Sequence, residues 1–471
     1  MPLIKSISGI RGTLGDKPGE DLTPEDVKKF TLAFATFLKA KNWGDQVVVG
    51  RDARPSGIKF KEIITNALSL AGFKVIDLDL ATTPTVEIAI IMTQAAGGIV
   101  ITASHNTLEW NALKLLNNQG EFLSAIDGAR ILELADLGVF PISETENDSA
   151  SLVAPKYEDE HIKSVISLPL VDPTSIQKAN FKIVVDGINS VGGVVIPKLL
   201  RALGVNNIIE LNCEPNGQFA HKPEPLAENL TQIMDKVRQE KADLGLVVDP
   251  DVDRLAFIDE NGEMFGEEYT LVAVADYVLE NFAVGDSIKP GKYQRATVSN
   301  LSSSRALKDV TEKQSGRYEA AAVGEVNVVT KMKELKAVIG GEGNGGIIYP
   351  AAHYGRDALV GSALFLSALA RSGQKMSEFR KKFPAYYMVK DKMELKSGFD
   401  LTGLLAQLKN SYRAEKITDI DGLKIDWPEV WVHLRASNTE PIMRLYAEAK
   451  TPAAASAKIK EIKDIILAYI K

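Results

Sequence analysis

The sequence predicts an α/β protein built from several domains. Apolar, strand-like runs alternate with amphipathic, helix-like runs along most of the chain. This alternation starts again near residue 181 and once more near residue 268, and the composition changes after about residue 383. A chain of 471 residues is also too long for a single core. We therefore expect three related α/β domains followed by a smaller α+β domain at the C-terminus.

The first domain is expected to span residues 1–155. Thr23 followed by Pro24 is a typical helix start, because threonine caps the free N–H groups and proline fits the first helical position. That helix should run to about Lys41. The remaining expected elements are a strand at 47–50, a helix at 60–71, a strand at 74–78 and a strand at 98–102.

Two further domains are expected at 156–263 and 264–384, and a fourth at 385–471. Their elements follow the same reading of apolar periodicity. In the second domain they are strands at 181–186, 207–211 and 244–248, and helices at 194–203 and 230–241. In the third they are helices at 268–282, 303–311 and 326–335, and strands at 295–299 and 337–339. In the fourth they are strands at 388–395, 431–434 and 443–448, and a closing helix at 453–470.

Composition narrows the class of protein. Hydrophobic residues make up 45% and charged residues 25% of the chain, with a net charge of −7, as in ordinary soluble proteins. No stripe of Lys and Arg is present, so nucleic acid is not an expected partner. The single cysteine, Cys213, excludes an internal disulfide and is expected to be structural. No signal peptide or membrane span is visible, so we expect a cytoplasmic protein.

A serine, Ser104, follows the predicted strand at 98–102. Its immediate neighbour His105 cannot act as the base of a Ser-His-Asp relay, so Ser104 is better suited to carry a group than to attack an acyl carbon. Phosphate is the best candidate for that group. Two asparagines and Lys114 follow in the same polar stretch.

Three aspartates follow the predicted strand at 244–248. Asp249, Asp251 and Asp253 alternate on a loop and can converge on one hard cation, for which Mg²⁺ is the natural choice. Arg254 beside them could hold a phosphate. A calcium-binding EF-hand is disfavoured, because that loop needs glycine where Arg254 stands. A solvated acidic loop without a metal is the other alternative.

Two later loops have polar groups suited to a sugar phosphate. The glycine-dense stretch 340–346 includes Glu342 and Asn344, which can accept from and donate to sugar hydroxyls. In the second loop, two arginines, two hydroxyls and an amide could cradle a phosphate dianion. These residues are Arg435, Ser437, Asn438, Thr439 and Arg444.

Three arginines near the N-terminus have simpler expected roles. Arg11 lies close to glycines on both sides. Arg51 and Arg54 follow the predicted strand at 47–50, and structural ion pairs are the better expectation for both.

Taken together and in this order, these segments resemble the α-D-phosphohexomutase superfamily. The family has a phosphoserine loop, here 102–107; a metal loop, here 249–254; a sugar loop, here beginning at Gly341-Glu342; and a phosphate loop, here 435–441. The resemblance covers essentially the whole chain. It implies three related α/β domains and a fourth, smaller one around a central cleft, to which each domain contributes one loop.

The resemblance also implies a mechanism. Phosphorylated Ser104 would exchange its phosphoryl group with a hexose phosphate through a hexose 1,6-bisphosphate, which serves as intermediate and activator. Mg²⁺ would be held by the three aspartates and a phosphoserine oxygen. Lys114 would stabilise charge or relay a proton beside the moving phosphate, and Arg11 would have a similar role. Glu342 and Asn344 would recognise the sugar hydroxyls, and the phosphate that does not react would be bound by Arg435, Ser437, Asn438, Thr439 and Arg444. His105 is a further candidate catalytic residue, and Arg254 a candidate for binding substrate phosphate.

Two features of the sequence, set against the family pattern, concern the identity of the general base and the choice of substrate. Gly324-Glu325 stands where many members have Gly-His, and candidates for the general base are Lys114, His105, His353 and Glu325. His353 could equally be an exposed structural residue. The Glu-Gly-Asn-Gly-Gly loop resembles the archaeal-type phosphoglucosamine mutase branch, so glucosamine 6-phosphate is the preferred substrate. Alternatives are a phosphomannomutase or phosphoglucomutase and, less favoured, a sugar phosphatase; the chain is expected to be a monomer or homodimer.

Overall fold

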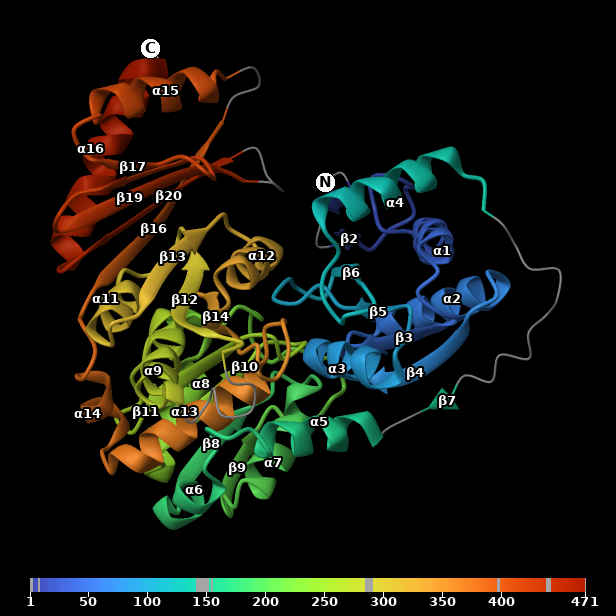
Figure 1. The fold of residues 1–471 in the computed structure, drawn as a ribbon, viewed down its shortest axis with the longest axis horizontal. Helices are drawn as coiled ribbons and strands as arrows, with labels where there is room; N and C mark the ends of the chain where they lie inside the picture. Colours follow the sequence, from blue (N-terminus) through green and yellow to red (C-terminus); the bar gives the residue numbers. More distant parts are fainter. Residues whose placement is uncertain are drawn as a thin grey trace.

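The chain forms four consecutive α/β domains, as expected. A computed structural model describes residues 3–6, 9–140, 152–153, 156–283, 291–395, 399–437 and 442–470. The first domain occupies one side of the molecule, and the other three are stacked along the opposite side (Figure 1). Each domain contains one sheet that is covered by helices.

The first domain contains a seven-stranded sheet in the order β1-β2-β6-β5-β3-β4-β7. Val47 and Val49 face a core shared with α1, α2 and α4, whereas Val48 faces α3, as the alternation of side chains along a strand requires. The strands are β1 (Ile4–Ser6), β2 (Gly9–Thr13), β3 (Gln46–Arg51), β4 (Lys74–Leu80), β5 (Gly97–Ile101), β6 (Trp110–Leu116) and β7 (Leu152–Val153). The helices are α1 (Pro24–Lys41), α2 (Ser56–Leu70), α3 (Thr83–Thr93) and α4 (Ala125–Leu137).

The second and third domains each contain a four-stranded sheet. The second contains α5 (Lys156–Ile166), α6 (Pro173–Ala179), β8 (Lys182–Asp186), α7 (Gly192–Ala202), β9 (Asn207–Leu211), α8 (Thr231–Glu240), β10 (Leu244–Val248) and β11 (Leu255–Asp259). The third contains α9 (Glu267–Glu280), β12 (Gln294–Asn300), α11 (Ala306–Lys313), β13 (Arg317–Ala321), α12 (Glu325–Leu335), β14 (Ala337–Glu342), β15 (Gly346–Ile348), α13 (Ala358–Ser372) and α14 (Met376–Arg380). One continuous apolar core joins them, with the rings of Phe257 and Phe365 stacked 3.9 Å apart.

The fourth domain is an antiparallel sheet in the order β16-β20-β19-β18-β17, packed against two helices. Its elements are β16 (Tyr387–Glu394), α15 (Leu401–Ser411), β17 (Lys416–Thr418), β18 (Leu423–Asp426), β19 (Val430–Ala436), β20 (Ile442–Ala449) and α16 (Pro452–Ile470). It therefore has its own core and the α+β character that the sequence predicts.

The first three sheets contain the same four-strand unit. In each unit three neighbouring strands are parallel and one antiparallel strand lies beside the last of them: β6-β5-β3-β4 within the seven-stranded sheet, and β11-β10-β8-β9 and β15-β14-β12-β13 in the other two. The link between the last parallel strand and the antiparallel one contains Ser104 in the first domain and Asp249–Arg254 in the second. In the third domain this link follows Glu342. The three predicted functional loops therefore occupy the same topological position in a structural repeat.

Most predicted elements are confirmed, and β9 and β10 have the predicted bounds. Several elements were not predicted from the sequence, among them α3, β6, α4 and α13. Helix α1 begins as expected, with Thr23 and Asp26 forming a reciprocal cap. Cys213 is half-buried against backbone carbonyls, and burial raises the pKa of its thiol to about 12, consistent with a structural role.

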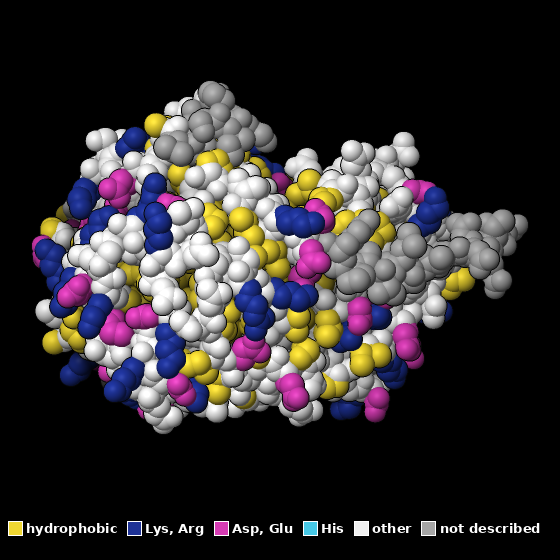
Figure 2. Space-filling model, turned by 90° about the horizontal axis from the view of Figure 1, so that it is seen from below, with side chains coloured by type: hydrophobic (Ala, Val, Ile, Leu, Met, Phe, Trp, Pro, Cys, Tyr) yellow, Lys and Arg dark blue, Asp and Glu magenta, His cyan; other side chains and the backbone are white. Residues whose placement is uncertain are grey.

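Two further observations concern the described surface and helices. On the face shown in Figure 2, Lys and Arg side chains are interspersed with Asp and Glu. Among the described residues, no helix combines the length and apolarity needed to cross a membrane.

Candidate active site

Ser104 lies just beyond the end of β5 and faces the second domain. It is buried, and its hydroxyl donates a hydrogen bond of 2.7 Å to Oδ2 of Asp249. Its backbone has a φ of +48°, a left-handed conformation that costs about 1 kcal/mol for a non-glycine residue. The surrounding loop must hold this conformation, and it brings the serine directly to the aspartate loop.

Arg54 holds the Ser104 loop in place. Its guanidinium is fully buried and donates to the backbone carbonyls of Ser104 at 2.5 Å, Asn106 at 2.7 Å and Thr107 at 2.6 Å. Asp52 accepts from Arg54 Nε at 2.9 Å and balances its charge. Arg54 is therefore structural, as expected, but what it positions is the loop that contains the serine.

The three aspartates converge in the interior. Asp249, Asp251 and Asp253 are fully buried, and one carboxylate oxygen from each lies within 4.8 Å of the others. Lys114 Nζ lies 2.5 Å from Asp251 Oδ2 and 3.1 Å from Asp253 Oδ2, and Arg356 Nη2 lies 2.7 Å from the same Asp253 oxygen. Strand β6 of the first domain and the segment before α13 therefore supply the counter-charges.

The acidity of the aspartates reflects these contacts. Burial raises the pKa of Asp249 well above its ordinary value, and Asp253 and Asp251 raise it further. Burial also acts to raise the pKa of Asp253, but Arg356, Lys114 and Arg254 outweigh it and hold that pKa below its usual range. Asp249 is thus the carboxylate with the least compensation from cations.

The aspartate loop fits a divalent cation. Oδ1 of Asp251 and Oδ1 of Asp253 are buried without a hydrogen-bond partner among the described residues. Together with Oδ2 of Asp249 and the Ser104 hydroxyl they form a set of hard oxygen donors, which Mg²⁺ prefers. Its flanking elements are the strands β10 and β11, which argues against an EF-hand.

A cavity of about 650 Å³ opens beside this cluster. Its described lining comes from the first three domains. From the first domain it includes Arg11, Ser104, His105, Lys114 and one side of α4; from the second, Arg254; and from the third, Glu325, Glu342, Asn344 and Arg356. Eleven of the predicted site residues and candidate bases therefore line this cavity or belong to the adjoining aspartate loop.

Arg356 organises the third-domain wall of the cavity. It donates to Glu342 Oε2 at 2.8 Å, and its Nε lies 3.0 Å from Glu325 Oε2. Asn300 also donates to Glu342, at 2.8 Å. The sequence analysis did not identify Arg356 as a site residue. No motif in the sequence marks Arg356, and only the fold brings it to Glu342 and Asp253.

Two histidines proposed as bases have different surroundings. His105 lines the cavity, and Arg254, burial and Arg11 lower its pKa well below the ordinary value, so it stays neutral at pH 7. One interpretation of the sequence placed His353 at the surface, and this is wrong. His353 is buried between Glu87 and Asp357, outside the described lining of the cavity. A general base acting in the cavity therefore has to be sought elsewhere than at His353.

The fourth-domain residues lie apart from this lining. Arg435 and Arg444 are directly opposite each other on β19 and β20, and Lys392 on β16 is opposite Arg444. Like charges that face each other across strands are unfavourable unless anions balance them. Asp421 Oδ2 lies 3.4 Å from Arg435 Nε and balances part of this charge, and a phosphate would balance more of it. Ser437 follows β19, whereas Asn438 and Thr439 lie outside the described residues.

Comparison with known proteins agrees with this architecture. Family models for the four domains of phosphoglucomutase/phosphomannomutase match residues 4–136, 159–262, 267–387 and 388–465. The chain belongs to the phosphoglucomutase/phosphomannomutase family. A protein of Thermococcus kodakarensis named phosphoglucomutase/phosphomannomutase is 35% identical over 94% of both chains. A phosphoglucosamine/phosphogalactosamine mutase of Sulfurisphaera tokodaii is 33% identical over 97% of this chain and 98% of its own.

Solved structures show the same fold. A phosphoglucomutase/phosphomannomutase family protein from Burkholderia thailandensis has a TM-score of 0.81 at 24% identity, covering 99% of this chain and 97% of its own. An N-acetylphosphoglucosamine mutase of Aspergillus fumigatus, solved with GlcNAc-6P and magnesium, has a TM-score of 0.57 at 14% identity, covering 94% and 97%. Membership of the phosphoglucomutase/phosphomannomutase family and the names of the two relatives identify the protein as an isomerase of the phosphohexomutase type.

Substitution of Arg54 should disturb the conformation of the Ser104 loop while the protein still folds. A lysine cannot donate to several carbonyls in a fixed fork, so Arg54→Lys is expected to lower kcat of the mutase at least tenfold. Arg51→Lys is the matched control, since Arg51 pairs with Asp79 and does not contact the Ser104 loop. Steady-state kinetics and thermal melting of both variants provide the test. Equal kcat values in two folded variants would contradict the role assigned to Arg54.

Proposed function

We propose that the protein interconverts glucosamine 6-phosphate and glucosamine 1-phosphate through a phosphorylated Ser104. The observation that carries the proposal is the placement of the Ser104 hydroxyl, 2.7 Å from Asp249 and at the edge of the cavity. The serine has no base relay of the hydrolase type. A hydroxyl surrounded by metal-binding carboxylates and cations is instead suited to holding and releasing a phosphoryl group.

The reaction requires two phosphoryl transfers. In the first, the P–O bond to Ser104 Oγ breaks as a bond forms from phosphorus to a sugar hydroxyl, whose proton leaves to a base and ends on Ser104 Oγ. The bisphosphorylated sugar then reorients in the cavity, so that its other phosphoryl group faces Ser104. Its other phosphoryl group then moves to Ser104 by the same step in reverse. No atom is gained or lost from the substrate and enzyme together.

Charge on the moving phosphoryl group is balanced from several sides. Mg²⁺, held by Asp249, Asp251, Asp253 and a phosphoserine oxygen, would neutralise charge on the phosphoryl oxygens. Lys114 lies against the aspartates and extends this positive surface. Arg11, fixed by its bond to Asn106 Oδ1 at 2.8 Å, approaches from the first domain, and Arg254 from the second.

Two lining groups can take the hydroxyl proton. His105 is neutral at pH 7 and so has a free ring nitrogen; its Nδ1 is buried without a hydrogen-bond partner among the described residues. Glu325 is a carboxylate whose pKa is raised by burial, which makes it a better proton acceptor than an exposed glutamate. Lys114 is engaged with two aspartates and serves as a fixed charge.

The non-reacting phosphate needs an anchor that serves both sugar orientations. The row of Lys392, Arg444 and Arg435 offers three cations at the ends of neighbouring strands of the fourth domain. Ser437, together with Asn438 and Thr439, would add hydroxyl and amide donors. Because these residues stand apart from the described lining, we propose that the fourth domain moves toward the cavity when substrate binds.

The third-domain wall favours an amino sugar. Glu325 and Glu342 contribute two carboxylates and Arg356 one guanidinium, so this wall has a formal charge of −1, whereas Lys5, Arg11, Lys114 and Arg254 make the other walls positive. The ammonium group of glucosamine would offset that charge, whereas the hydroxyl of glucose or mannose would not. Glu342 and Asn344 would bind the sugar hydroxyls. The relative named phosphoglucosamine/phosphogalactosamine mutase supports this choice, and the relative named phosphoglucomutase/phosphomannomutase supports the alternative.

Phosphorylation of Ser104 is the first test of this proposal. After incubation with hexose 1,6-bisphosphate labelled in phosphorus, wild-type protein should carry one phosphoryl group on the peptide that contains Ser104. Ser104→Ala should carry none, and Ser124→Ala, which removes an exposed cap of α4, should label as wild type. If the wild-type protein carries no label, or carries it on another residue, the mechanism is wrong. Release of free phosphate at the rate of turnover would identify a phosphatase.

Substrate preference tests the charge of the third-domain wall. We expect kcat/KM for glucosamine 6-phosphate to exceed that for glucose 6-phosphate and mannose 6-phosphate. Glu325→Gln should reduce this preference about tenfold, because a hydrogen bond between charged groups is worth about 1.5–3 kcal/mol. Glu334→Gln, on the exposed face of the same helix, should leave it unchanged. A preference for glucose or mannose phosphates in the wild type would assign the enzyme to the other branch.

A further inference from the structure

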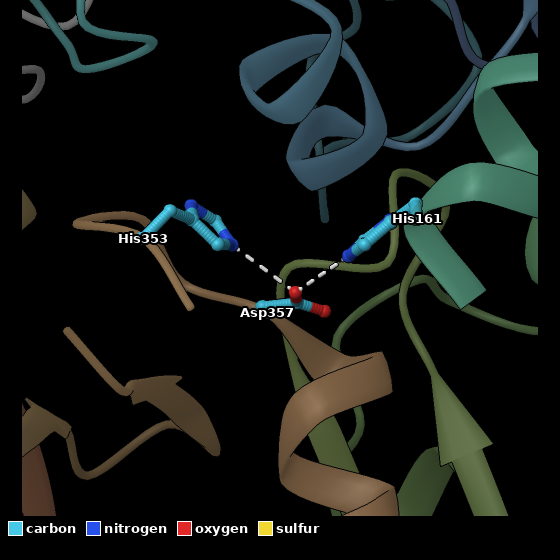
Figure 3. A group of neighbouring side chains, drawn as sticks. All are labelled: His161, His353 and Asp357. Atoms are coloured by element: carbon cyan, nitrogen blue, oxygen red, sulfur yellow. Dashed lines mark hydrogen bonds and ion pairs between the residues drawn. The ribbon is translucent and has the colours of Figure 1, made fainter. Parts of the chain in front are cut away.

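A second cluster of buried polar side chains lies outside the cavity. His161 and His353 approach Asp357 from opposite sides, and both direct Nε2 at the same carboxylate oxygen, Oδ2 (Figure 3). The distances are 2.9 Å and 3.1 Å, respectively. All three residues are buried, and the three ligand-type atoms lie within 4.8 Å of one another.

The cluster joins three domains. His161 is on α5 at the start of the second domain, and His353 and Asp357 precede α13 in the third. From the first domain, α3 contributes Thr85 and Glu87, which contact the two imidazoles. Its members therefore come together only when the first three domains are assembled.

The same segments also build the active site. Thr83, at the start of α3, donates to Asp251 Oδ2 at 2.5 Å, while Glu87 lies one turn further along the helix and faces the cluster. Arg356 contacts Asp253 and Glu342, while its neighbour Asp357 turns to the histidines. The cluster therefore adjoins the aspartate loop, because α3 and the segment before α13 contact both.

The outer contacts of the two imidazoles match those of metal-bound histidines. A histidine that binds a metal through one nitrogen usually donates the other N–H to a carboxylate or another acceptor. Here Nδ1 of His353 lies 3.2 Å from Glu87 Oε2, and Nδ1 of His161 lies 3.0 Å from Thr85 Oγ1. The Nε2 atoms are left to point inward together.

A dication would also balance the charge of the cluster. With both imidazoles neutral and both carboxylates of Asp357 and Glu87 ionised, this buried group would have a formal charge of −2, which either a bound dication or added protons must offset; burial raises the pKa of Glu87 to about 8. Buried, unbalanced charge is strongly unfavourable. Nitrogen donors with one carboxylate suit Zn²⁺ and its neighbours in the transition series, unlike the all-oxygen set of the aspartate loop.

We propose that His161, His353 and Asp357 form a second metal site, specific for a transition-metal dication such as Zn²⁺. Zn²⁺ binds nitrogen and oxygen at about 2.0–2.2 Å, which is compatible with donors about 3 Å apart. A water molecule would complete the coordination. The ion would hold the first three domains together behind the reacting groups, and its role is structural.

The competing arrangement has a proton in place of the metal. Asp357 and Glu87 together raise the pKa of His353 to about 10, although burial lowers it, so an imidazolium could supply the positive charge. In that case the cluster would be a closed hydrogen-bonded network with no affinity for Zn²⁺. The two arrangements make opposite predictions for metal binding.

Metal titration distinguishes them. Full-length protein stripped with a chelator and then saturated with Mg²⁺, which occupies the aspartate loop, should take up one further Zn²⁺ or Co²⁺ per chain. Bound Co²⁺ should show the visible absorption of nitrogen ligation, and Zn²⁺ should raise the thermal midpoint of the Mg²⁺-loaded protein. His161→Gln and His353→Gln should each weaken this binding at least tenfold, and Glu87→Gln about tenfold.

Controls keep the result interpretable. His433→Gln removes another buried histidine, one bonded to Ser302 and to the Asp421 carbonyl far from the cluster, and should bind Zn²⁺ as wild type does. Asp357 also caps α13 through Leu359 and Val360, so it is left intact. The absence of a second metal in wild-type protein, or its retention in both histidine variants, would overturn the proposal. Neither result bears on phosphorylation of Ser104.

Discussion

The structure depends on the repulsion among three buried carboxylates. Asp249, Asp251 and Asp253 lie at the end of one strand with an oxygen of each within 4.8 Å of the others. At such distances like charges in a protein interior repel by several kcal/mol, so the aspartates require cations nearby. Lys114 comes from the first domain and Arg356 from the third, and the oxygens left without partners suit Mg²⁺. The domains must therefore meet where the carboxylates are.

A repeated topology makes that meeting possible. In each of the first three domains a turn connects the last parallel strand to an antiparallel neighbour, and the predicted functional residues lie at that turn. Three copies of one sheet arranged around a common space bring three turns together. In the proposed function the first turn would supply the serine that carries the phosphoryl group, the second the metal site and the third a wall that contacts the sugar. Helix α3 and the segment before α13 link these turns through Thr83 and Arg356.

Much of this could be predicted from sequence, because the key residues follow strongly apolar strands. The run before Ser104 and the run before Asp249 are fully buried strands, and their ends place polar residues predictably. Helix α3 was missed because it is buried nearly all round and lacks an amphipathic period. Strand β6 was missed because Lys114 interrupts its apolar pattern, and that lysine is buried only through its contacts with distant aspartates. The surroundings of Arg54, Arg356 and His353 likewise depend on partners far away in the chain.

The central claim is that the aspartates and Ser104 form a single cation site facing the cavity. Its most direct test is a crystal structure with Mn²⁺ in place of Mg²⁺, recorded for the anomalous signal of manganese. The account predicts one strong peak bonded to carboxylate oxygens of Asp249, Asp251 and Asp253 and to the oxygen of Ser104 or its phosphate. A site without manganese, or manganese bound by other groups while the aspartates keep only Lys114 and Arg356, would contradict it.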